Sequence, residues 1–524
     1  MKLYSENESY KLYQGNMLDM LDVIEPNTID SIVTDPPYEL NFMGKGWDNS
    51  GIAFQPSTWQ KCYEVLKPGG YLLAFGGSRT FHRIACAIED AGFEIRDTIM
   101  WLYGSGFPKS MDISKQIDKK GGNDYSKQFA IDLKQARESR NLTMKYCDDK
   151  YCNGSTNWSW YEGRKDGCRV PDYNTYLEII KEFPELEKYK ELIKEAEREV
   201  IGHITRTKGI GIPACGEIVD RSEYNYNITT ASTDLAKQWQ GWGTALKPSF
   251  EPIIVARKPF KGSLVDNVIE YGVGGINIDE CRVGNKHFEI KNGEYDEPTN
   301  NAFGHIKKTP KEYDGRFPAN TILTYDETDF EEVCGGFPDT KSNGGKTSMP
   351  KMNSKSDGIN IYNFGLKNAP RIENNYVAPC DSGSASRYFY CAKASKKDRD
   401  EGLDTFNEEK VNDGRNTPID NAFQRGETLR KNTHPTVKPT ELMQYLVRLV
   451  TPNNGIVLDP FNGSGSTGKA VMYENRERNK NYKYIGIELT EEYLPIAKAR
   501  IEYVCNLEPE KDNQLTIFDF IGEE

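Results

Sequence analysis

The order of hydrophobic and polar residues near the start of the chain predicts strands and helices in alternation. An apolar run at residues 29–33 ends before Pro36-Pro37, which fits a buried strand followed by a rigid turn, because neither proline can donate a hydrogen bond to a sheet. The elements predicted after it are a helix from about 56 to 66, a turn at 67–70, a strand at 71–75, a helix from about 80 to 91 and a strand at 93–101. Such alternation is typical of a largely parallel sheet with helices on both faces.

The alternation returns near the other end of the chain. The elements predicted there are a helix at 440–450, a strand at 455–459, a helix at 463–473, a strand at 484–489 and a helix at 491–503. Two α/β halves therefore flank a middle, about 104–431, that is rich in Asn, Gly, Ser and Lys. Within it we expect core strands at 250–259 and 386–394, and a long loop or a partner-ordered segment at 339–381.

Composition supports a globular protein of the cytoplasm. Apolar residues make up 37% of the chain, which is enough for a substantial core. The sequence has no apolar run long enough to cross a bilayer, and its first residues lack the apolar stretch of a signal peptide. The eleven cysteines are odd in number and scattered, which favours a reducing compartment over a disulfide framework. We therefore expect a soluble, cytoplasmic protein.

Charge is distributed unevenly along the chain. The net charge of -12 excludes a protein that coats nucleic acid by bulk positive charge. Residues 341–399 nevertheless hold 11 Lys or Arg against 4 Asp or Glu, which is a local +7 and leaves -19 for the rest. An acidic body with a basic stretch suits selective contact with phosphates. The basic residues that could track phosphates are Arg387, Lys393, Lys396, Lys397 and Arg399, and a solvated loop is the alternative.

A glycine-rich turn separates the strand at 455–459 from the next helix. The turn, DPFNGSG at 459–465, has two glycines that allow tight turning and close approach of a ligand, while amides at the helix start can meet a carboxylate or hydroxyl. The next strand ends in Glu488, where an acid can accept both ribose hydroxyls of a nucleoside-bearing cofactor. The alternatives are an ordinary strand-to-helix turn and a solvated carboxylate at a strand end.

The sharper signal is the tetrapeptide Asp35-Pro36-Pro37-Tyr38. To bind an exocyclic amino group on a planar heterocycle, a site needs acceptors in the ring plane and an apolar face above it. The Asp35 carboxylate and the Pro36 carbonyl can supply the acceptors and Tyr38 the face, with the prolines fixing all three. The alternative is an ordinary Pro-Pro turn with a helix-capping Asp.

Together these motifs resemble those of the amino-group DNA methyltransferases. In that family the tetrapeptide is DPPY, NPPY or SPPY, and the cofactor turn is FxGxG, which matches residues 461–465. The segment HPTVKP at 434–439 is similar to the family's segment before the cofactor strand, with Thr436, Lys438 and Pro439 matching. The order of the motifs, tetrapeptide first, resembles the circularly permuted beta class. One departure is Asn16, which replaces an Asp that approaches the cofactor adenine; its carbonyl can still accept from an amino group.

The resemblance implies a Rossmann-like S-adenosylmethionine-dependent methyltransferase fold, α/β and mostly parallel, circularly permuted and with large inserted regions. It implies S-adenosylmethionine as cofactor, DNA as substrate, no metal, and N6 of adenine as methyl acceptor. The implied catalytic residues are Asp35, Pro36, Pro37 and Tyr38. The implied cofactor-binding residues are Asn16, Asp35, Thr436, Lys438, Pro439, Asp459, Pro460, Phe461, Asn462, Gly463, Gly465 and Glu488.

The resemblance also assigns roles to the segments of the chain. They are 1–110, the catalytic half of the methyltransferase domain; 111–240, an inserted region; 241–262, a core segment; 263–385, an insertion and candidate target recognition region; 386–431, a core strand and basic loop; and 432–524, the cofactor-binding half. The implied reaction is direct attack of the amino nitrogen on the sulfonium methyl group. Asp35 and Pro36 would accept the amino hydrogens, on a base that has left the duplex to stack on Tyr38.

Several alternatives stay open at this level. Cytosine N4 is the other possible acceptor, although DPPY is more usual for adenine enzymes. A methyltransferase acting on RNA or on protein glutamine is a rival, but there the cofactor turn typically precedes the tetrapeptide. A non-catalytic helix-turn-helix DNA-binding regulator is another. The sequence is compatible with a monomer or homodimer and identifies neither a recognition sequence nor a nuclease partner.

The inserted region contains a further pattern at 133–183. It resembles a helix-turn-helix domain of the phage-repressor type, with a helix to about Ser139, a cap at Thr143, a second helix, and a third at 158–161. Residues 134–169 hold 8 basic against 5 acidic residues, a weak positive excess. An inserted helical packing domain without DNA contact fits equally well.

The cysteines suggest no chemistry of their own. Cys147, Cys152 and Cys168, with His203 downstream, lack the paired spacing of a zinc site, so we expect buried or idle thiols. Pro379-Cys380 is similar to the nucleophile dipeptide of enzymes that methylate cytosine carbon, but no supporting motif accompanies it.

Overall fold

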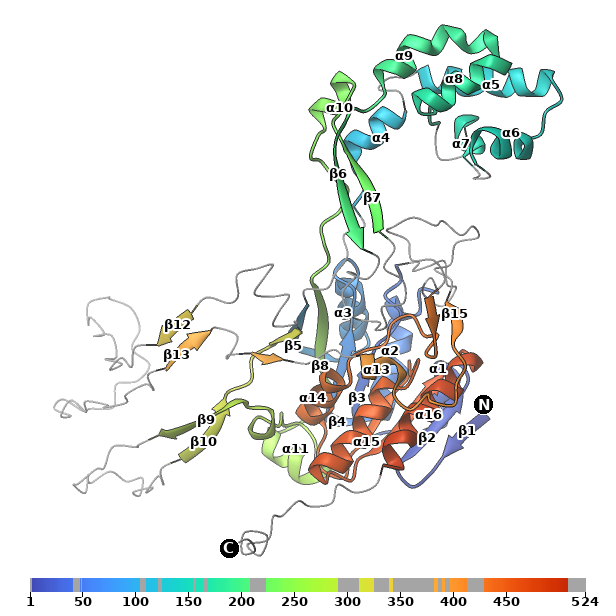
Figure 1. Ribbon diagram of the computed structural model, residues 1–524. Helices are drawn as coiled ribbons and strands as arrows, with labels where there is room; N and C mark the ends of the chain where they lie inside the picture. Colours follow the sequence, from blue (N-terminus) through green and yellow to red (C-terminus); the bar gives the residue numbers. More distant parts are fainter. Residues whose placement is uncertain are drawn as a thin grey trace, which may run out of the picture. The chain divides into compact units, whose positions relative to one another are not determined.

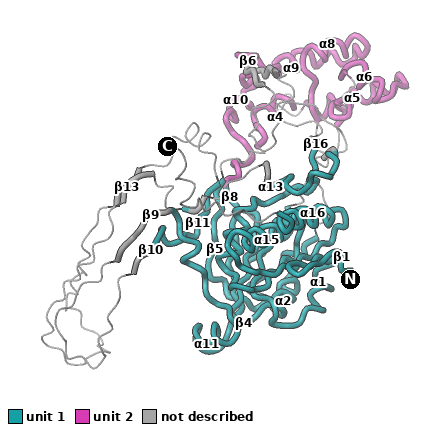
Figure 2. The backbone as a smooth tube through the Cα atoms, turned by 60° about the horizontal axis from the view of Figure 1, so that its bottom comes forward, with its two compact units in different colours: residues 1–104, 250–419, 425–524 teal, residues 105–249, 420–424 magenta. Residues whose placement is uncertain are grey.

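A computed structural model describes most of the two α/β halves and part of the middle. The described residues are 2–40, 48, 50–103, 110–120, 125–153, 157–163, 168–207, 223–290, 311–324, 339–342, 381–384, 389–391, 396–411 and 428–507. The chain divides into two compact units, unit 1 with residues 1–104, 250–419 and 425–524, and unit 2 with residues 105–249 and 420–424 (Figure 2).

A sheet of ten strands forms the centre of unit 1 (Figure 1). Its strands, in spatial order, are β1 (Lys2–Glu6), β2 (Tyr10–Gln14), β18 (Lys483–Glu488), β17 (Ile456–Asp459), β3 (Ile29–Thr34), β4 (Leu66–Phe75), β8 (Phe250–Arg257), β5 (Glu94–Tyr103), β11 (Thr321–Thr324) and β14 (Tyr390–Cys391). Strands from β2 to β4 are parallel, so β17 from the end of the chain pairs with β3 from its start. β8 runs antiparallel to both β4 and β5.

Helices cover both faces of this sheet. α14 (Thr440–Val450), α15 (Ser466–Arg478) and α16 (Leu494–Cys505) share one apolar core with one face, and lie side by side in Figure 1. α1 (Met17–Leu21), α2 (Pro56–Val65) and α3 (Phe81–Asp90) share a second core with the other face. The α/β architecture with a mostly parallel sheet, expected from the alternating pattern, is confirmed.

The smaller elements of unit 1 lie outside this sheet. They are α11 (Leu264–Tyr271), α13 (Lys396–Asp400), the 3-10 turns η3 (Ile52–Phe54), η5 (Asp279–Cys281) and η7 (Glu491–Tyr493), and the antiparallel pairs β9 (Val283–Ile290) with β10 (Lys311–Arg316), β12 (Asp339–Ser342) with β13 (Asp381–Ser384), and β15 (Glu409–Val411) with β16 (Thr428–Arg430). Arg399 of α13 donates to the carbonyl of His434 at 2.9 Å. The phosphate-tracking candidates Arg387 and Lys393, like Pro379-Cys380, lie outside the described residues.

Most predicted elements of the two halves are confirmed, but the turn at 67–70 is wrong. β4 begins at Leu66 and runs through this stretch. Gly69 has a φ of +83°, its amide donates to Lys258 at 2.9 Å, and the Gly70 carbonyl accepts from the Lys258 amide at 2.9 Å. A left-handed glycine thus produces a local irregularity without reversing the chain. The helix predicted from 463 begins at Ser466, because Gly463 and Gly465 both have positive φ.

Unit 2 is mainly helical and has its own core. Its elements are α4 (Ile113–Lys119), α5 (Tyr125–Ser139), α6 (Met144–Tyr151), α7 (Trp158–Tyr161), α8 (Tyr173–Glu182), η4 (Pro184–Tyr189), α9 (Lys190–Glu195), α10 (Asp234–Gln238) and the hairpin of β6 (Val200–Thr207) and β7 (Glu223–Thr229). Phe129, Leu133, Trp158, Tyr176 and Phe183 pack together in the core. Among the described residues of the chain, no helix is long and apolar enough to cross a membrane.

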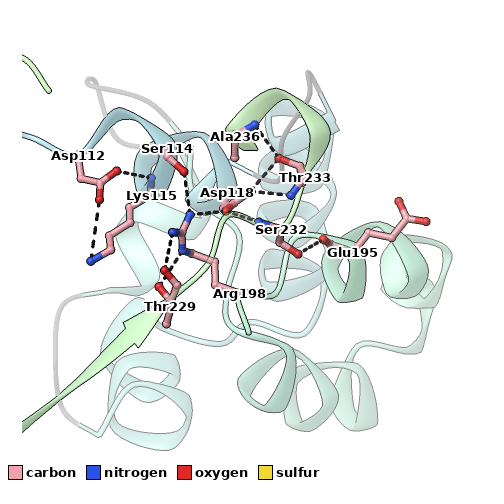
Figure 3. A network of polar contacts seen from close by, with 10 residues as sticks. All are labelled: Asp112, Ser114, Lys115, Asp118, Glu195, Arg198, Thr229, Ser232, Thr233 and Ala236. Atoms are coloured by element: carbon pink, nitrogen blue, oxygen red, sulfur yellow. Dashed lines mark hydrogen bonds and ion pairs between the residues drawn. The ribbon is translucent and has the colours of Figure 1, made fainter. Parts of the chain in front are cut away.

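An ion pair in unit 2 joins α4 to the segment between α9 and β6 (Figure 3). Arg198 donates to Asp118 Oδ2 at 2.6 Å and to the Thr229 hydroxyl at 2.9 Å. Asp118 also accepts from the amides of Ser232 and Thr233, each at 3.1 Å. Both oxygens of Asp118 are engaged by these contacts, so the network closes the helical unit and leaves that carboxylate no role in chemistry.

The helices of the helix-turn-helix pattern lie where the sequence predicts them. Thr143 caps α6 by accepting from the Tyr146 amide at 3.1 Å. Several of the basic residues are engaged within the unit, because Arg137 pairs with Glu162, Arg140 with Glu185 and Lys150 with Glu182. These pairs reduce the charge available for phosphates, and contact with DNA stays a prediction.

The cysteines of this region are free thiols. Cys147 and Cys152 are buried, and burial raises the pKa of the Cys147 thiol to about 12. No group of three or more His, Cys, Asp or Glu side chains among the described residues could hold a metal ion.

Candidate active site

The site lies where the carboxyl ends of β3 and β17 meet. The two strands pair in parallel register, with Val457 opposite Ser31 and Leu458 opposite Ile32. Just beyond, the Thr34 hydroxyl donates to Asp459 Oδ1 at 2.6 Å. A crevice beyond the carboxyl ends of parallel strands is where open α/β sheets bind ligands. The start and the end of the chain therefore meet at this edge of the sheet, which brings the tetrapeptide at 35–38 close to the turn at 459–465.

Asp459 organises the start of the glycine-rich turn. It is 2% exposed, and its second oxygen accepts from the Thr467 hydroxyl at 2.6 Å. Burial raises its pKa to about 6. The Phe461 amide donates to Asp459 Oδ1 at 3.1 Å, while the side chain of the buried Asn462 accepts from the Tyr484 hydroxyl at 2.8 Å. Asp459 thus fixes the backbone of the turn from below.

The two glycines of the turn are required by close neighbours as well as by their backbone. Gly463 has a φ of +52°, and a Cβ there would lie 2.8 Å from Nε2 of His434. Gly465 has a φ of +74°, and a Cβ there would lie 3.0 Å from Cα of Ala497. A side chain at either position would have to displace a neighbour and adopt an unfavourable conformation.

Glu488 holds this turn from the end of β18. Its Oε2 accepts from the Gly463 amide at 2.7 Å and its Oε1 from the Thr490 amide at 2.7 Å. The residue is 8% exposed, and burial raises its pKa. The alternative of a solvated carboxylate is therefore wrong. Next to it, the exposed Asn16 caps α1 by accepting from the Leu18 amide at 3.1 Å, which occupies the oxygen expected to meet an amino group.

Asp35 follows β3 and faces a lysine from the far end of the chain. Its Oδ2 lies 2.6 Å from Nζ of Lys438, whereas Oδ1 is buried and has no hydrogen-bond partner among the described residues. Burial raises the pKa of Asp35, although Lys438 opposes the rise. Residues 36–40 contain no helix, so Asp35 is not a helix cap. Lys438 thus holds Oδ2 in place, and Oδ1 can accept a hydrogen bond from a ligand.

Tyr38 is fixed at both its hydroxyl and its main chain. The hydroxyl donates to Glu251 Oε2 at 2.7 Å, and the main-chain carbonyl accepts from the Thr80 hydroxyl at 2.8 Å. Burial, together with the charges of Asp35 and Glu251, raises the pKa of Tyr38, so the phenol stays protonated. Glu251 is a site residue to which the sequence assigned no role, although it lies in the predicted core strand at 250–259.

Residues of the HPTVKP segment at 434–439 contact both motifs, the tetrapeptide and the glycine-rich turn. Lys438 is 7% exposed and contacts Asp35, while Pro439 precedes α14 and Thr436 is exposed. His434 packs against Gly463, and burial with three nearby cations lowers the pKa of its imidazole to about 3. His434 is therefore neutral at physiological pH. The sequence identified Lys438 but suggested the cofactor turn rather than Asp35 as its neighbour.

The fold and the site define a class of protein. In this α/β sheet, β3 from the start of the chain lies beside β17 from its end, so a buried acceptor after β3 lies beside the glycine-rich turn after β17. This is the arrangement of a nucleoside-cofactor-dependent transferase acting on a polar group. The chain belongs to the DNA methylase family, whose family model matches residues 29–120 and 112–499. The expected family and the Rossmann-like fold are thereby confirmed.

Individual relatives match shorter stretches. The type II methyltransferase M.HpaI of Haemophilus parainfluenzae is 28% identical over 160 residues, which are 29% of this chain and 50% of that protein. The putative methylase YubD of Escherichia coli is 45% identical over 71 residues, 14% of this chain and 29% of that protein. The DNA adenine methyltransferase YhdJ of Escherichia coli is 33% identical over 78 residues, 15% and 24% of the two chains. The chain thus spans half or less of the length of these relatives.

Alignments to solved DNA methyltransferase structures cover nearly the whole chain, with low identity and low TM-scores. The cytosine-N4-specific PvuII DNA methyltransferase is 10% identical, with a TM-score of 0.34, and the match covers 98% of this chain and 92% of that one. M1.HpyAVI is 12% identical, with a TM-score of 0.30, covering 95% and 99%.

S-adenosylmethionine is the cofactor of this family, and the residues of the turn fit it. The glycines at 463 and 465 leave no room for a side chain, which keeps the backbone of the turn open to a ligand, and buried Glu488 holds the Gly463 amide. A small polar nucleoside with a charged tail suits such a turn. The cofactor expected from the sequence is confirmed at the level of the family.

Proposed function

We propose that the chain is a site-specific DNA methyltransferase that transfers a methyl group from S-adenosylmethionine to N6 of adenine. The observation that carries the proposal is the buried Oδ1 of Asp35, which has no hydrogen-bond partner in the part of the chain that the structure describes; the preceding residue, Thr34, is bonded to Asp459 at the start of the glycine-rich turn. An acceptor in that position can accept a hydrogen bond from the amino group of the base while the methyl donor is bound beside it.

The cofactor, when bound, supplies an electrophilic methyl group on a sulfonium. On the protein side, Glu488 would accept hydrogen bonds from the ribose hydroxyls while it still accepts one from the Gly463 amide. The other residues that we assign to the cofactor pocket are Asn16, Thr436, Pro439, Asp459, Pro460, Phe461, Asn462 and Gly465. We assign Lys438 to Asp35 rather than to the cofactor, because its ammonium lies 2.6 Å from that carboxylate.

Asp35 and Pro36 would activate the amino group. The lone pair of an aromatic amine is delocalised into the ring, which makes the nitrogen a poor nucleophile. Acceptance of one hydrogen by Asp35 Oδ1 and of the other by the Pro36 carbonyl returns lone-pair density to the nitrogen and orients it for in-line attack. Pro37 stiffens the turn, and Tyr38 provides a ring on which the extruded base can stack.

Adenine is preferred to cytosine on the tetrapeptide DPPY, and the similarity to YhdJ, which is named as a DNA adenine methyltransferase, supports the choice. The test is single-molecule sequencing of DNA from cells that express the chain, which reads the modified base and its sequence context together. N6-methyladenine in one sequence context is expected. N4-methylcytosine would redirect the proposal to the second acceptor, and unmodified DNA would contradict it.

Substitution of Gly463 should weaken cofactor binding. Gly463→Val places a side chain against His434 and strains a φ of +52°, so we expect a fall in cofactor affinity of about 100-fold, measured by calorimetry. Gly272→Val is the matched control, because that glycine also has a positive φ but a Cβ there would meet nothing within 4 Å. Equal affinities in the two variants would argue against the placement of the pocket.

The role of unit 2 in DNA binding can be tested on two exposed lysines. If the helix-turn-helix segment contacts phosphates, Lys134→Glu with Lys145→Glu should weaken DNA affinity and reduce the salt dependence by about two counterions. The measurement is a salt titration of binding to a DNA duplex. An unchanged salt slope would instead favour an inserted packing domain. The segment 263–385 stays our candidate for target recognition.

A further inference from the structure

The catalytic tetrapeptide contacts one carboxylate from outside both motifs. Glu251 lies near the start of β8, opposite Trp101 of β5 in register. Because β8 is antiparallel to its neighbours, its start lies at the same edge of the sheet as the carboxyl end of β4. The topology therefore brings a residue of the middle region to the edge where β3 ends and Asp35 begins.

Glu251 makes three polar contacts there. Its Oε2 accepts from the Tyr38 hydroxyl at 2.7 Å and lies 3.5 Å from Nζ of Lys438. Its Oε1 accepts from the Tyr103 hydroxyl at 3.4 Å. The side chain is 21% exposed, against 7% for Lys438 and 19% for Asp35. Lys438 is thus shared between two carboxylates, one on each side.

We propose that Glu251 is a positioning residue for methyl transfer, which sets the ring of Tyr38 through its hydroxyl and holds Lys438 against Asp35. The inference rests on the proposed function and adds a residue to it. A stacking ring needs a fixed plane, and the bond from the hydroxyl to Glu251 removes its freedom to tilt. Misplacement of a reacting group by about 1 Å can cost about 100-fold in rate, so a fixed ring matters for the reaction.

The contacts of Asp35 predict that Glu251 also affects the pH dependence of the rate. Among the described residues, the charged or titratable groups that face this carboxylate are Lys438, Glu251, Tyr38 and Asp459. Among them, the negative charge of Glu251 raises the pKa of Asp35. Asp35 must be ionised to accept an amino hydrogen, so the rate is lost as the pH falls through its pKa. Removing the charge of Glu251 should therefore move that loss to lower pH.

Two variants of Glu251 separate its tasks. Glu251→Gln keeps an acceptor for the Tyr38 hydroxyl and removes the charge, so we expect a loss of about 10-fold in single-turnover rate and an acid limb displaced to lower pH. Glu251→Leu removes both, and a loss of about 100-fold is expected. In Glu251→Leu, the further change Tyr38→Phe should cost little, because the hydroxyl has already lost its acceptor.

Glu94→Gln is the matched control. Glu94 lies on β5 at the other end of the same strand pair, where it forms an ion pair with Arg257 at 2.7 Å. Its loss should leave the rate and the pH profile unchanged. Wild-type rates in both Glu251 variants, an unmoved acid limb in Glu251→Gln, or additive losses on combining Glu251→Leu with Tyr38→Phe would overturn the inference. Absence of transfer by the unmodified chain would instead count against the proposed function.

Discussion

Asp35→Ala is expected to lower the single-turnover rate of methyl transfer by about 100- to 1,000-fold while cofactor affinity stays within a few-fold of the unmodified chain. The rate falls because the buried Oδ1 is the free acceptor at the end of β3, and removing a preorganised electrostatic contact of this kind costs about 100- to 1,000-fold. Cofactor affinity persists because the turn at 459–465 is held by Glu488 and Thr467. Labelled cofactor with a DNA substrate measures the rate, and calorimetry the affinity.

The fold should survive this substitution. Lys438 loses its 2.6 Å contact to Asp35 but keeps Glu251 at 3.5 Å, so its ammonium is not left without a counter-charge. Asp30→Asn is the matched control, because Asp30 lies near the start of the same strand and pairs with Lys67. That variant should transfer methyl groups at the normal rate once folded. Near-normal transfer by Asp35→Ala would remove the carboxylate from the central role.

The sequence predicted β3 and β17 of the parallel part of the fold because each of these strands ends at residues with strong conformational preferences, whereas β2 was not predicted. The apolar run of β3 stops at two prolines, and that of β17 stops at Asp459 before two glycines. Prolines and glycines carry conformational information in single residues, so both ends of the future site could be located without knowledge of the rest. Pairing of the two ends followed from the resemblance rather than from the pattern.

The remainder of the site depends on contacts between distant segments. Glu251 lies 213 positions from Tyr38, and its presence at the site depends on β8 running antiparallel between β4 and β5. An apolar pattern predicts a strand but not its direction. The sequence offered one signal, a glutamate near the first residue of a strongly apolar strand, which is an unusual position for a charge in a core element.

Two further contacts escaped prediction for a related reason. His434 received no role from the sequence, yet its imidazole lies against Gly463 closely enough to exclude any side chain there. Lys438 was expected at the cofactor and instead contacts Asp35. Both positions follow from the loop before α14, whose path is set by contacts such as that of Arg399 with the His434 carbonyl and not by a local pattern. Motif matching located the residues, but only packing revealed their partners.

Asp118→Ala is expected to destabilise unit 2 by about 3–5 kcal/mol, the cost of leaving a buried partner charge uncompensated. Asp118 is 2% exposed at its side chain and Arg198 14%, so the lost contact at 2.6 Å is largely shielded from solvent. The amides of Ser232 and Thr233 would also lose their acceptor. Hydrogen exchange in the full chain should show faster opening of α4 and α10.

The control for this prediction lies on the same helix. Asp112 caps α4 by accepting from the Lys115 amide at 3.0 Å, but its side chain is 47% exposed, so Asp112→Ala should cost about 1 kcal/mol. Both variants shorten an aspartate of α4 to alanine, and they differ in whether a buried cation is left behind. If the two changes accelerate exchange equally, the buried pair is not what closes unit 2. If the change at 118 is several-fold larger, the ion pair between α4 and the segment before β6 contributes strongly to the stability of unit 2, and Asp118 is a position at which that stability can be altered without changing β3 or β17.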